Sequence, residues 1–250
     1  MPVNPPRRCL IVITGVTRGL GRALVDEFVR AGCFVHGCAR TKDQIHLLRG
    51  VYPDHSFAIV DVRSNQQVRT WIKELVAKCG PPDLVLNNAA VFGGKAPVWR
   101  IGDKRFREEI ETNIVGTVNI IRHVAPAMIA RRRGIIVNFT SRWGRRYEAG
   151  MGPYCATKSA VVALTKVLSC EFQEAGVAAV ALNPGVVRTK MLRRYFGFAY
   201  RDKNDEYVSA AAWAKAAVPR LLRLRCCDNG RLLTIAVRQQ RSSFGTSSKK

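Results

Sequence analysis

The chain has 250 residues, enough for one α/β domain with a large core. Hydrophobic residues make up 47% of the chain, but no stretch approaches the roughly 20 consecutive apolar residues that span a bilayer. Basic residues outnumber acidic ones by 41 to 18, which gives a net charge of +23.

This charge would suit nucleic acid, an acidic protein or a phosphorylated ligand as a partner. The basic residues gather at 131–133, 142–146, 188–194 and 220–225. They do not form an aromatic-interleaved platform or a zinc-finger pattern. We therefore interpret them as a solvated surface and expect neither a nucleic-acid partner nor a membrane partner.

The eight cysteines are scattered, and none forms a C-x-x-C pair. This pattern indicates reduced thiols and no disulfide framework or metal site. The start, MPVNPPRR, is too short and too rich in proline for a signal or transit peptide. We expect a cytoplasmic protein.

Residues 9–14 form an apolar, β-branched run that predicts a buried strand. A glycine-rich turn follows, with Gly15, Gly19 and Gly21 in the pattern G-x-x-x-G-x-G, and then a helix to about residue 31. A glycine turn between a strand and a helix lets backbone N–H groups approach a pyrophosphate at the helix N-terminus. The turn therefore predicts a dinucleotide site.

The second predicted strand, 33–39, ends at Arg40. An acidic residue here would accept hydrogen bonds from an adenosine ribose and favour NAD. This chain instead has Arg40, with Arg18 in the glycine turn, and two cations suit the 2′-phosphate of NADP. The alternative is that Arg40 simply begins an exposed loop.

The remaining pattern alternates strands with helices. Strands are expected near 57–60, 83–86, 135–139, 177–182 and 232–237, and helices near 65–78, 103–130, 153–175 and 209–223. This alternation predicts an α/β fold, a doubly wound Rossmann-type parallel sheet of about seven strands with helices on both faces.

One domain is expected over 9–237, after a short N-terminal extension at 1–8 and before a basic, disordered tail at 238–250. Residues 189–207 are basic and aromatic and are expected to be irregular. We interpret them as a lid or specificity loop, and an ordinary surface insertion is the alternative.

Tyr154 and Lys158 lie one turn apart on the predicted helix that begins at Pro153. An ammonium beside a phenol favours the phenolate, so we expect the pKa of Tyr154 to fall from about 10 toward neutral pH. Such a phenol can exchange a proton with a carbonyl or alcohol oxygen, and the nearby Ser141 can hydrogen-bond the same oxygen. Taken alone, Y-x-x-x-K is also compatible with a buried helix that happens to carry both residues.

Several motifs together resemble those of the short-chain dehydrogenases/reductases, over about residues 8–237. They are Thr14-Gly15-x-x-x-Gly19-x-Gly21, Asp61, Asn87-Asn88-Ala89, Asn113, Ser141, Tyr154-x-x-x-Lys158 and Pro184-Gly185. One departure is Ala90, where the family usually has glycine. We expect slight crowding there, and strain if the position requires a positive φ.

This resemblance implies the roles of the site residues. Ser141 would orient the substrate carbonyl and Tyr154 would be the general acid. Lys158 would lower the pKa of Tyr154 and bind the nicotinamide ribose, and Asn113 would hold a water in the proton relay. The implied cofactor-binding residues are Gly15, Thr17, Arg18, Gly19, Leu20, Gly21, Arg40, Asp61, Val62, Asn88, Ala89, Tyr154, Lys158, Pro184, Gly185, Val187 and Thr189.

Within the family, residues 37–40, 143–145, 153–156, 180–186 and 228–230 resemble plant-type NADPH-dependent pterin aldehyde reductases. Arg142 and residues 146–152 depart from that group. The resemblance implies NADPH-dependent reduction of an aldehyde or ketone, with a pterin aldehyde as a candidate substrate. It also implies a homodimer or homotetramer that packs through 103–130 and 153–175.

Two alternatives stay open at this point. A 3-oxoacyl-carrier-protein reductase would use an acidic carrier protein, which the basic run 131–133 could attract. A non-catalytic Rossmann protein with a regulatory or nucleic-acid-associated role would explain the charge, although it would not need Ser141, Tyr154 and Lys158 together.

Overall fold

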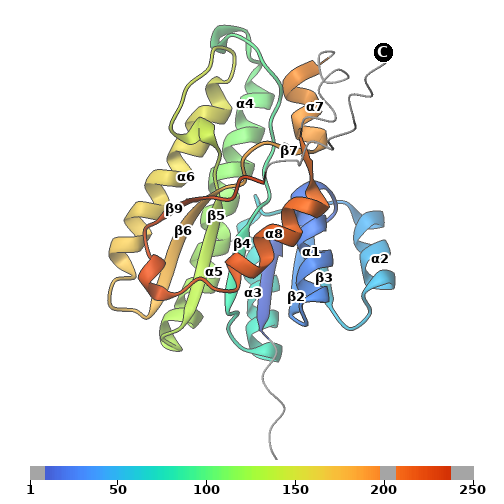
Figure 1. Cartoon of the computed structure of the whole chain (residues 1–250), viewed down its shortest axis with the longest axis vertical. Coiled ribbons are helices and arrows are strands. Elements are labelled where there is room, and N and C mark those ends of the chain that lie inside the picture. Colours follow the sequence, from blue (N-terminus) through green and yellow to red (C-terminus); the bar gives the residue numbers. More distant parts are fainter. Residues whose placement is uncertain (1–8, 198–206, 238–250) are drawn as a thin grey trace, which may run out of the picture.

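The computed structural model describes residues 9–197 and 207–237. Their centre is one parallel sheet of seven strands (Figure 1). The strands, in spatial order, are β3 (Ser56–Ile59), β2 (Phe34–Ala39), β1 (Leu10–Thr14), β4 (Leu84–Asn87), β5 (Gly134–Phe139), β6 (Val177–Asn183) and β9 (Leu232–Thr234). The predicted doubly wound parallel sheet is confirmed.

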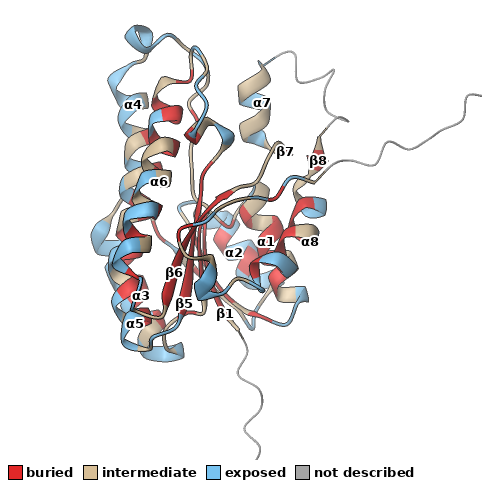
Figure 2. Cartoon of the chain, turned by 60° about the vertical axis from the view of Figure 1, so that its left-hand side comes forward, coloured by how far each residue is buried: buried red, intermediate tan, exposed pale blue. Residues whose placement is uncertain are grey.

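The two faces of the sheet follow from the alternation of side chains along a strand. In β1, Leu10 and Val12 join one apolar cluster, while Ile11 and Ile13 join the other. All four are buried, which is why the strand reads as a continuous apolar run. Figure 2 shows the buried strands between helices whose outer surfaces are exposed.

Two layers of helices cover the sheet (Figures 1 and 2). One face is covered by α1 (Gly19–Arg30), α2 (Lys42–Val51) and α8 (Ala210–Leu221). The other is covered by α3 (Asn65–Cys79), α5 (Gly116–Ala130) and α6 (Gly152–Glu171), with α4 (Asp103–Ile110) continuing α5 beyond the sheet.

The strand order reverses between β1 and β4, because the chain passes to β2 and β3 on one side and to β4, β5 and β6 on the other. In open α/β sheets, ligands bind outside the carboxyl ends of the strands at such a switch point. Above this edge lie α7 (Lys190–Phe196) and the two-stranded pair β7 (Val187–Arg188) and β8 (Val208–Ser209) (Figure 1).

The structure differs from the expected local structure in three places. Helix α2 was not expected at all, because its only buried side chains are Ile45 and Leu48. The segment 189–207 is not irregular throughout, since α7 begins directly after Thr189, whose hydroxyl accepts a hydrogen bond from the Leu192 backbone. The predicted helical region 103–130 is confirmed, but it contains a π-helical turn, Glu111–Val115, that was not expected.

The predicted N-terminal extension, most of the second half of the predicted lid, and the predicted tail lie outside the described residues. No helix in the described part of the chain is both long enough and apolar enough to cross a bilayer.

Candidate active site

The predicted site residues gather at one edge of the sheet, although they are far apart in sequence. Each follows the carboxyl end of a strand: Gly15 after β1, Arg40 after β2, Asp61 after β3, Asn88 after β4, Ser141 after β5 and Pro184 after β6. Helix α6 then brings Tyr154 and Lys158 to the same edge.

Helix α6 is fixed against β5 by the catalytic candidates and their neighbours. The Lys158 ammonium donates a hydrogen bond to the Phe139 carbonyl oxygen at 2.8 Å, and Thr140 Oγ1 donates to the Lys158 carbonyl at 3.0 Å. Lys158 Nζ lies 5.7 Å from the centre of the Tyr154 ring. Both side chains are buried, so the pair sits one turn apart in a water-poor environment.

Burial moves the two pKa values in opposite directions. It raises the pKa of Tyr154 well above its ordinary value, and the hydrogen bond with Ser141 offsets only part of this rise. Burial lowers the pKa of Lys158 to about 8. The prediction that Lys158 brings the Tyr154 pKa down is therefore wrong for this structure, because desolvation of the phenolate dominates and the group that opposes it is Ser141.

Ser141 begins the 3₁₀ turn η3 (Arg142–Gly144) and serves as its N-cap. Its Oγ accepts a hydrogen bond from the Trp143 backbone N–H at 3.4 Å. This contact holds the hydroxyl at the start of the turn, where it also meets the Tyr154 phenol. The structure thus brings Ser141, Tyr154 and Lys158 together.

Asn113 lies in the π-helical turn, a feature that is frequent at functional sites. Its Oδ1 accepts from Val91 N–H at 2.8 Å, and its Nδ2 donates to the Val91 carbonyl at 3.0 Å. Nδ2 also donates to Thr157 Oγ1 at 3.1 Å. The side chain therefore joins the loop after β4 to helix α6, and the predicted water relay stays a prediction.

The glycine-rich turn is held by Asn88. Its Nδ2 donates to the carbonyl oxygens of Thr14 at 2.8 Å and Gly15 at 3.3 Å. A Cβ at Gly21 would lie 2.1 Å from the Gly15 carbonyl oxygen and 2.5 Å from Asn88 Nδ2, and Gly15 itself has a φ of +74°. Side chains are thus excluded from both positions, which leaves the first turn of α1 open to a ligand.

The segment after β6 also comes close to the glycine turn. A Cβ at Gly19 would lie 3.5 Å from the Thr189 side chain. Gly185 has a φ of +74°, and its N–H donates to Asn183 Oδ1 at 3.1 Å. Gly19 and Thr189, two predicted cofactor-binding residues that are far apart in sequence, therefore lie close together.

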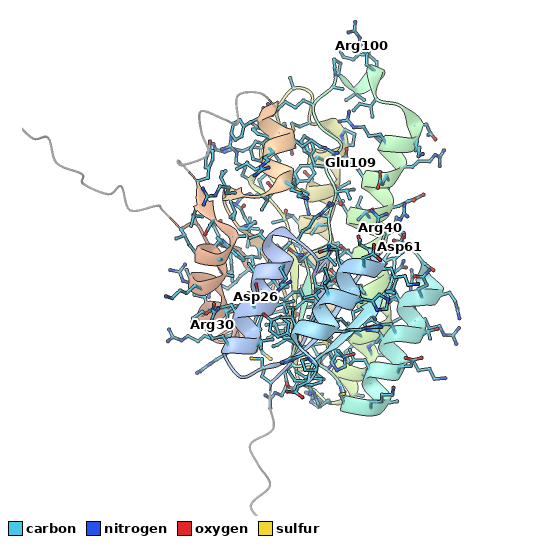
Figure 3. All side chains as sticks on the ribbon, turned by 90° about the vertical axis from the view of Figure 1, so that its right-hand side faces the viewer. Asp26, Arg30, Arg40, Asp61, Arg100 and Glu109 are labelled. Carbon is cyan, nitrogen blue, oxygen red and sulfur yellow. The ribbon has the colours of Figure 1, made fainter. Side chains whose placement is uncertain are left out.

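At the far end of the site, Arg40 meets a carboxylate cluster (Figure 3). Its guanidinium lies 3.9 Å from Asp61 and 3.5 Å from Glu108. Asp61 is held more tightly by Arg63, whose Nε and Nη2 lie 2.9 and 2.5 Å from Oδ2. Burial alone would raise the pKa of Asp61, but the hydrogen bonds from Arg63 outweigh it and lower that pKa. Arg63 is a third cation here that sequence reasoning missed.

An apolar cluster surrounds the Tyr154 hydroxyl, and sequence reasoning missed most of its members. The Phe92 ring packs edge-on against the Tyr154 ring with centroids 5.3 Å apart. Met191 of α7 places its sulfur 3.8 Å from the Tyr154 hydroxyl. The cluster residues are Phe92, Met151, Tyr154 and Cys155, with Trp143, Met191 and Tyr195 packed against them.

The loop that carries Phe92 is fixed from helix α4 and from α7. The Gly93 N–H donates to the buried Glu109 at 2.9 Å, and Arg194 donates to the Phe92 carbonyl at 3.1 Å. Burial raises the pKa of Glu109. Strain at Ala90 is not found, since Arg132 is the only non-glycine residue with positive φ among those that the structure describes.

Within residues 9–197 and 207–237, no group of three or more His, Cys, Asp or Glu side chains could hold a metal ion.

Comparison with known proteins gives consistent results. A family model described as "short chain dehydrogenase" matches residues 9–197. The chain is 38% identical over 228 residues to the NADPH-dependent pterin aldehyde reductase of Arabidopsis thaliana, a match that covers 90% of this chain and 92% of the relative. It is 32% identical over 188 residues to a 3-oxoacyl-acyl-carrier-protein reductase of Staphylococcus epidermidis, covering 72% and 75% of the two chains.

Among solved structures, a gluconate 5-dehydrogenase from Burkholderia cenocepacia in complex with NADP and tartrate superimposes with a TM-score of 0.80. The two sequences are 27% identical, and the match covers 90% of this chain and 92% of the other.

Proposed function

The chain belongs to the short-chain dehydrogenases/reductases, and we propose that it uses NADPH to reduce an aldehyde or ketone to the alcohol, with a pterin aldehyde as its substrate. The observation that carries the chemistry is the buried Tyr154, whose hydroxyl meets Ser141 one helical turn from the Lys158 ammonium. Carbonyl reduction requires a proton donor at the developing alkoxide, and this arrangement supplies one.

The residues present fit a dinucleotide cofactor. The exclusion of side chains at Gly15 and Gly21 leaves the backbone N–H groups of the first turn of α1 accessible to a pyrophosphate. Arg18 and Arg40 suit a 2′-phosphate. Bound NADPH supplies a hydride, and the protein's contribution is to hold the carbonyl carbon in line with it. The residues that would hold it are Gly15, Thr17, Arg18, Gly19, Leu20, Gly21, Arg40, Asp61, Val62, Asn88, Ala89, Tyr154, Lys158, Pro184, Gly185, Val187 and Thr189.

Tyr154 acts as the general acid. Because burial raises its pKa, the phenol keeps its proton at neutral pH and can give it to the carbonyl oxygen as negative charge develops there. The Ser141 hydroxyl donates a second hydrogen bond to the same oxygen and polarises the carbonyl.

Lys158 stabilises the product of this proton transfer. With a pKa of about 8, it is mostly an ammonium at neutral pH, and it faces the phenolate that Tyr154 becomes. The attraction between the two charges is strong because both groups are buried. Asn113 maintains the distance between helix α6 and the loop at Val91, and we propose that a water beside it returns the proton to Tyr154.

The substrate proposal rests on two observations. The relative with 38% identity over 90% of the chain is a pterin aldehyde reductase. The cluster beside Tyr154 also contains Phe92, Trp143 and Tyr195, and aromatic rings favour a flat, aromatic substrate. We propose that Arg142–Gly152 and α7, as a lid, decide which carbonyl compound enters.

The proton-donor role is tested by Tyr154→Phe, which removes the hydroxyl and keeps the ring. This variant should bind NADPH as the wild type does and lose reduction by about 100-fold or more. Tyr52→Phe is the matched control, because the Tyr52 hydroxyl bonds Asp26, away from the site, and its loss should leave turnover unchanged. Turnover retained in Tyr154→Phe would exclude this mechanism.

The cofactor assignment is tested by Arg40→Asp, which replaces a cation with a carboxylate at the proposed 2′-phosphate position. The ratio of kcat/KM for NADPH to that for NADH should fall by about 10-fold or more, since charge-assisted hydrogen bonds are lost and like charges are opposed. Arg30→Asp makes the same charge change at the far end of α1 and should leave the ratio intact (Figure 3). An unchanged ratio in Arg40→Asp would remove Arg40 from the cofactor site.

Reduction of a carrier-bound 3-oxoacyl group is the second candidate, favoured by the 32% identical relative. It predicts faster turnover of an acyl-carrier-linked ketone than of any free aldehyde. Turnover of free pterin aldehyde with no acceleration on the carrier-linked substrate would set this candidate aside.

We also propose a homodimer or homotetramer that packs through 103–130 and 153–175. Phe106, Val115 and Val167 on these segments are exposed by 41, 39 and 54%, so an apolar surface is present there. Light scattering of the wild type and of Phe106→Glu tests the assembly, and a monomeric wild type would contradict it.

We further propose a cytoplasmic protein with one domain over 9–237. All eight cysteines are free, which suits a reducing compartment. Cell fractionation tests the location. Limited proteolysis tests the domain, since cleavage inside 9–197 before loss of the two ends would contradict it.

A further inference from the structure

Glu148 lies between Ser141 and Tyr154 in the sequence and joins three segments that surround the Tyr154 hydroxyl. Its Oε1 accepts a hydrogen bond from Lys95 Nζ at 2.5 Å. Its Oε2 accepts from the Trp143 indole N–H at 3.0 Å. The Tyr195 hydroxyl lies 2.9 Å from Oε1 and 2.8 Å from Oε2. One carboxylate thus ties together the loop after β4, the turn after β5 and helix α7.

The donors are also packed against one another. The Trp143 and Tyr195 rings meet edge to face with centroids 5.3 Å apart. Lys95 Nζ lies 4.0 Å from the centre of the Tyr195 ring and forms an ion pair with Glu148. Phe92 connects this group to Tyr154, with ring centroids 6.5 Å from Tyr195 and 5.3 Å from Tyr154. One carboxylate therefore binds the polar groups of both aromatic rings, while Arg142, 4.0 Å from the centre of the Trp143 ring, and Phe196, 4.7 Å from that of Tyr195, pack against the rings themselves.

The carboxylate is well suited to this task, because its acceptor positions are filled by three donors. Burial alone would raise the pKa of Glu148, but the hydrogen bonds from Lys95, Tyr195 and Trp143 outweigh burial and lower that pKa. Glu148 is therefore charged at neutral pH, and hydrogen bonds to a charged acceptor are short and directional.

These contacts place the rings close to the reacting atoms. Trp143 is two residues after Ser141, and α7 carries both Tyr195 and Met191, whose sulfur is 3.8 Å from the Tyr154 hydroxyl. A rotation of Trp143 or a shift of α7 would change what packs beside that hydroxyl. Glu148 resists both movements.

We infer that Glu148 is a positioning residue that fixes Trp143 and Tyr195 as aromatic walls beside the Tyr154 hydroxyl, so that the site selects planar aromatic aldehydes over flexible aliphatic ones. The inference rests on the proposed carbonyl reduction. It assigns to Glu148 no contact with the reacting atoms. A flat ring system gains edge and face contacts with fixed aromatic walls, whereas an alkyl chain gains little from their orientation.

The test uses the full-length protein with NADPH and three aldehydes: pterin-6-carboxaldehyde, 2-naphthaldehyde and hexanal. Wild type should prefer both aromatic aldehydes to hexanal in kcat/KM. Glu148→Gln should raise the KM for the aromatic aldehydes about tenfold and leave kcat within about twofold, because the charged acceptor is lost while the proton donor remains. The kcat/KM for hexanal and the KM for NADPH should stay unchanged.

Two further variants separate positioning from general damage. Tyr195→Phe keeps the ring and removes only the hydroxyl that bonds Glu148, so it should raise the aromatic KM in the same direction as Glu148→Gln. Glu74→Gln, an exposed glutamate on α3, is the matched control and should leave all three substrates unaffected.

The outcomes distinguish this inference from the proposed function. If wild type reduces none of the aldehydes with NADPH, the proposed function fails. If wild type reduces them but prefers none, or if Glu148→Gln and Tyr195→Phe both keep the aromatic preference, the inference about Glu148 is overturned while the proposed function stands. If Glu148→Gln lowers kcat equally for all three aldehydes, Glu148 supports the catalytic groups in general and the specificity role is refuted.

Discussion

A chain of buried amides beneath the site should stabilise the fold cooperatively. Asn87 Nδ2 donates to Asn138 Oδ1 at 2.8 Å, and Asn138 Nδ2 donates to Thr165 Oγ1 at 3.0 Å. The three side chains are 4, 0 and 1% exposed. They join β4 and β5, which lead to Asn88 and Ser141, to α6, which carries Tyr154. We expect removal of the middle residue to be costly.

Asn138→Leu removes both hydrogen bonds, worth about 0.5–1.5 kcal/mol each. It also leaves the Asn87 amide without any partner, because Asn87 Oδ1 already lacks one. A buried donor left unsatisfied costs about 1–3 kcal/mol, so the free energy of unfolding should fall by about 2–6 kcal/mol. The double variant Asn87→Leu/Asn138→Leu also removes that donor. The decrease in the free energy of unfolding of the double variant should be smaller than the sum of the decreases in the two single variants by at least about 1 kcal/mol.

Urea unfolding of the wild type, both single variants and the double variant measures this coupling. Protomer concentration must be equal and NADPH omitted, since assembly and ligand shift the apparent stability. Single losses that add within about 0.5 kcal/mol would refute the reasoning, because independent sites behave in that way.

Three other predictions concern the site. The pKa of Lys158 is about 8, so kcat/KM for reduction should fall as pH rises through about 8. In Lys158→Arg, whose guanidinium stays charged, any remaining activity should not show this fall. A wild-type kcat/KM that stays constant up to about pH 9 would contradict the prediction. Burial raises the pKa of Glu109, so its stabilising contribution is present at low pH and is lost as pH rises through the folded-state value. The gain in urea midpoint of Glu109→Gln over wild type should therefore be larger at pH 7.5 than at pH 4.5, and equal gains would count against it. Gly21→Ala would place a Cβ 2.1 Å from the Gly15 carbonyl oxygen and should weaken NADPH binding at least about fivefold in a fluorescence titration, whereas Gly50→Ala, with no atom within 4 Å, should not.

Most of the fold could be predicted because its signals are local. Buried parallel strands are continuous apolar runs, and α1, α3 and α6 are helices of 12 to 20 residues that each bury several side chains. Helix α2 has only ten residues, buries only Ile45 and Leu48 and contains Gly50, so its signal is short. Helix α7 has seven residues and no fully buried side chain. Its position depends on contacts with distant segments, and the hydrophobic pattern of the sequence does not predict such contacts.

The same distinction applies to the site. Ser141, Tyr154 and Lys158 could be found because they follow a strand end or share one helix face. Glu148 could not, since Lys95 and Tyr195 are 53 and 47 residues away in sequence. The direction in which the Tyr154 pKa shifts could not be predicted from the sequence either, because it depends on how completely the surrounding cluster excludes water from the phenol.

The burial that raises the pKa of Tyr154 also affects how Lys158 can assist proton transfer from Tyr154 to the substrate. In the proposed mechanism, Tyr154 is neutral before proton transfer and the Lys158 ammonium is the only charge of the pair, so the raised pKa of the phenol keeps the proton on Tyr154. After transfer, a phenolate faces that ammonium in the same water-poor surroundings, where opposite charges attract far more strongly than in water. Desolvation thus opposes an isolated phenolate, and the attraction to Lys158 offsets this cost only once the proton has moved. An ammonium with a pKa of about 8 can provide this offset below that pH and not above it, so proton transfer to the substrate and the charge on Lys158 should be lost together.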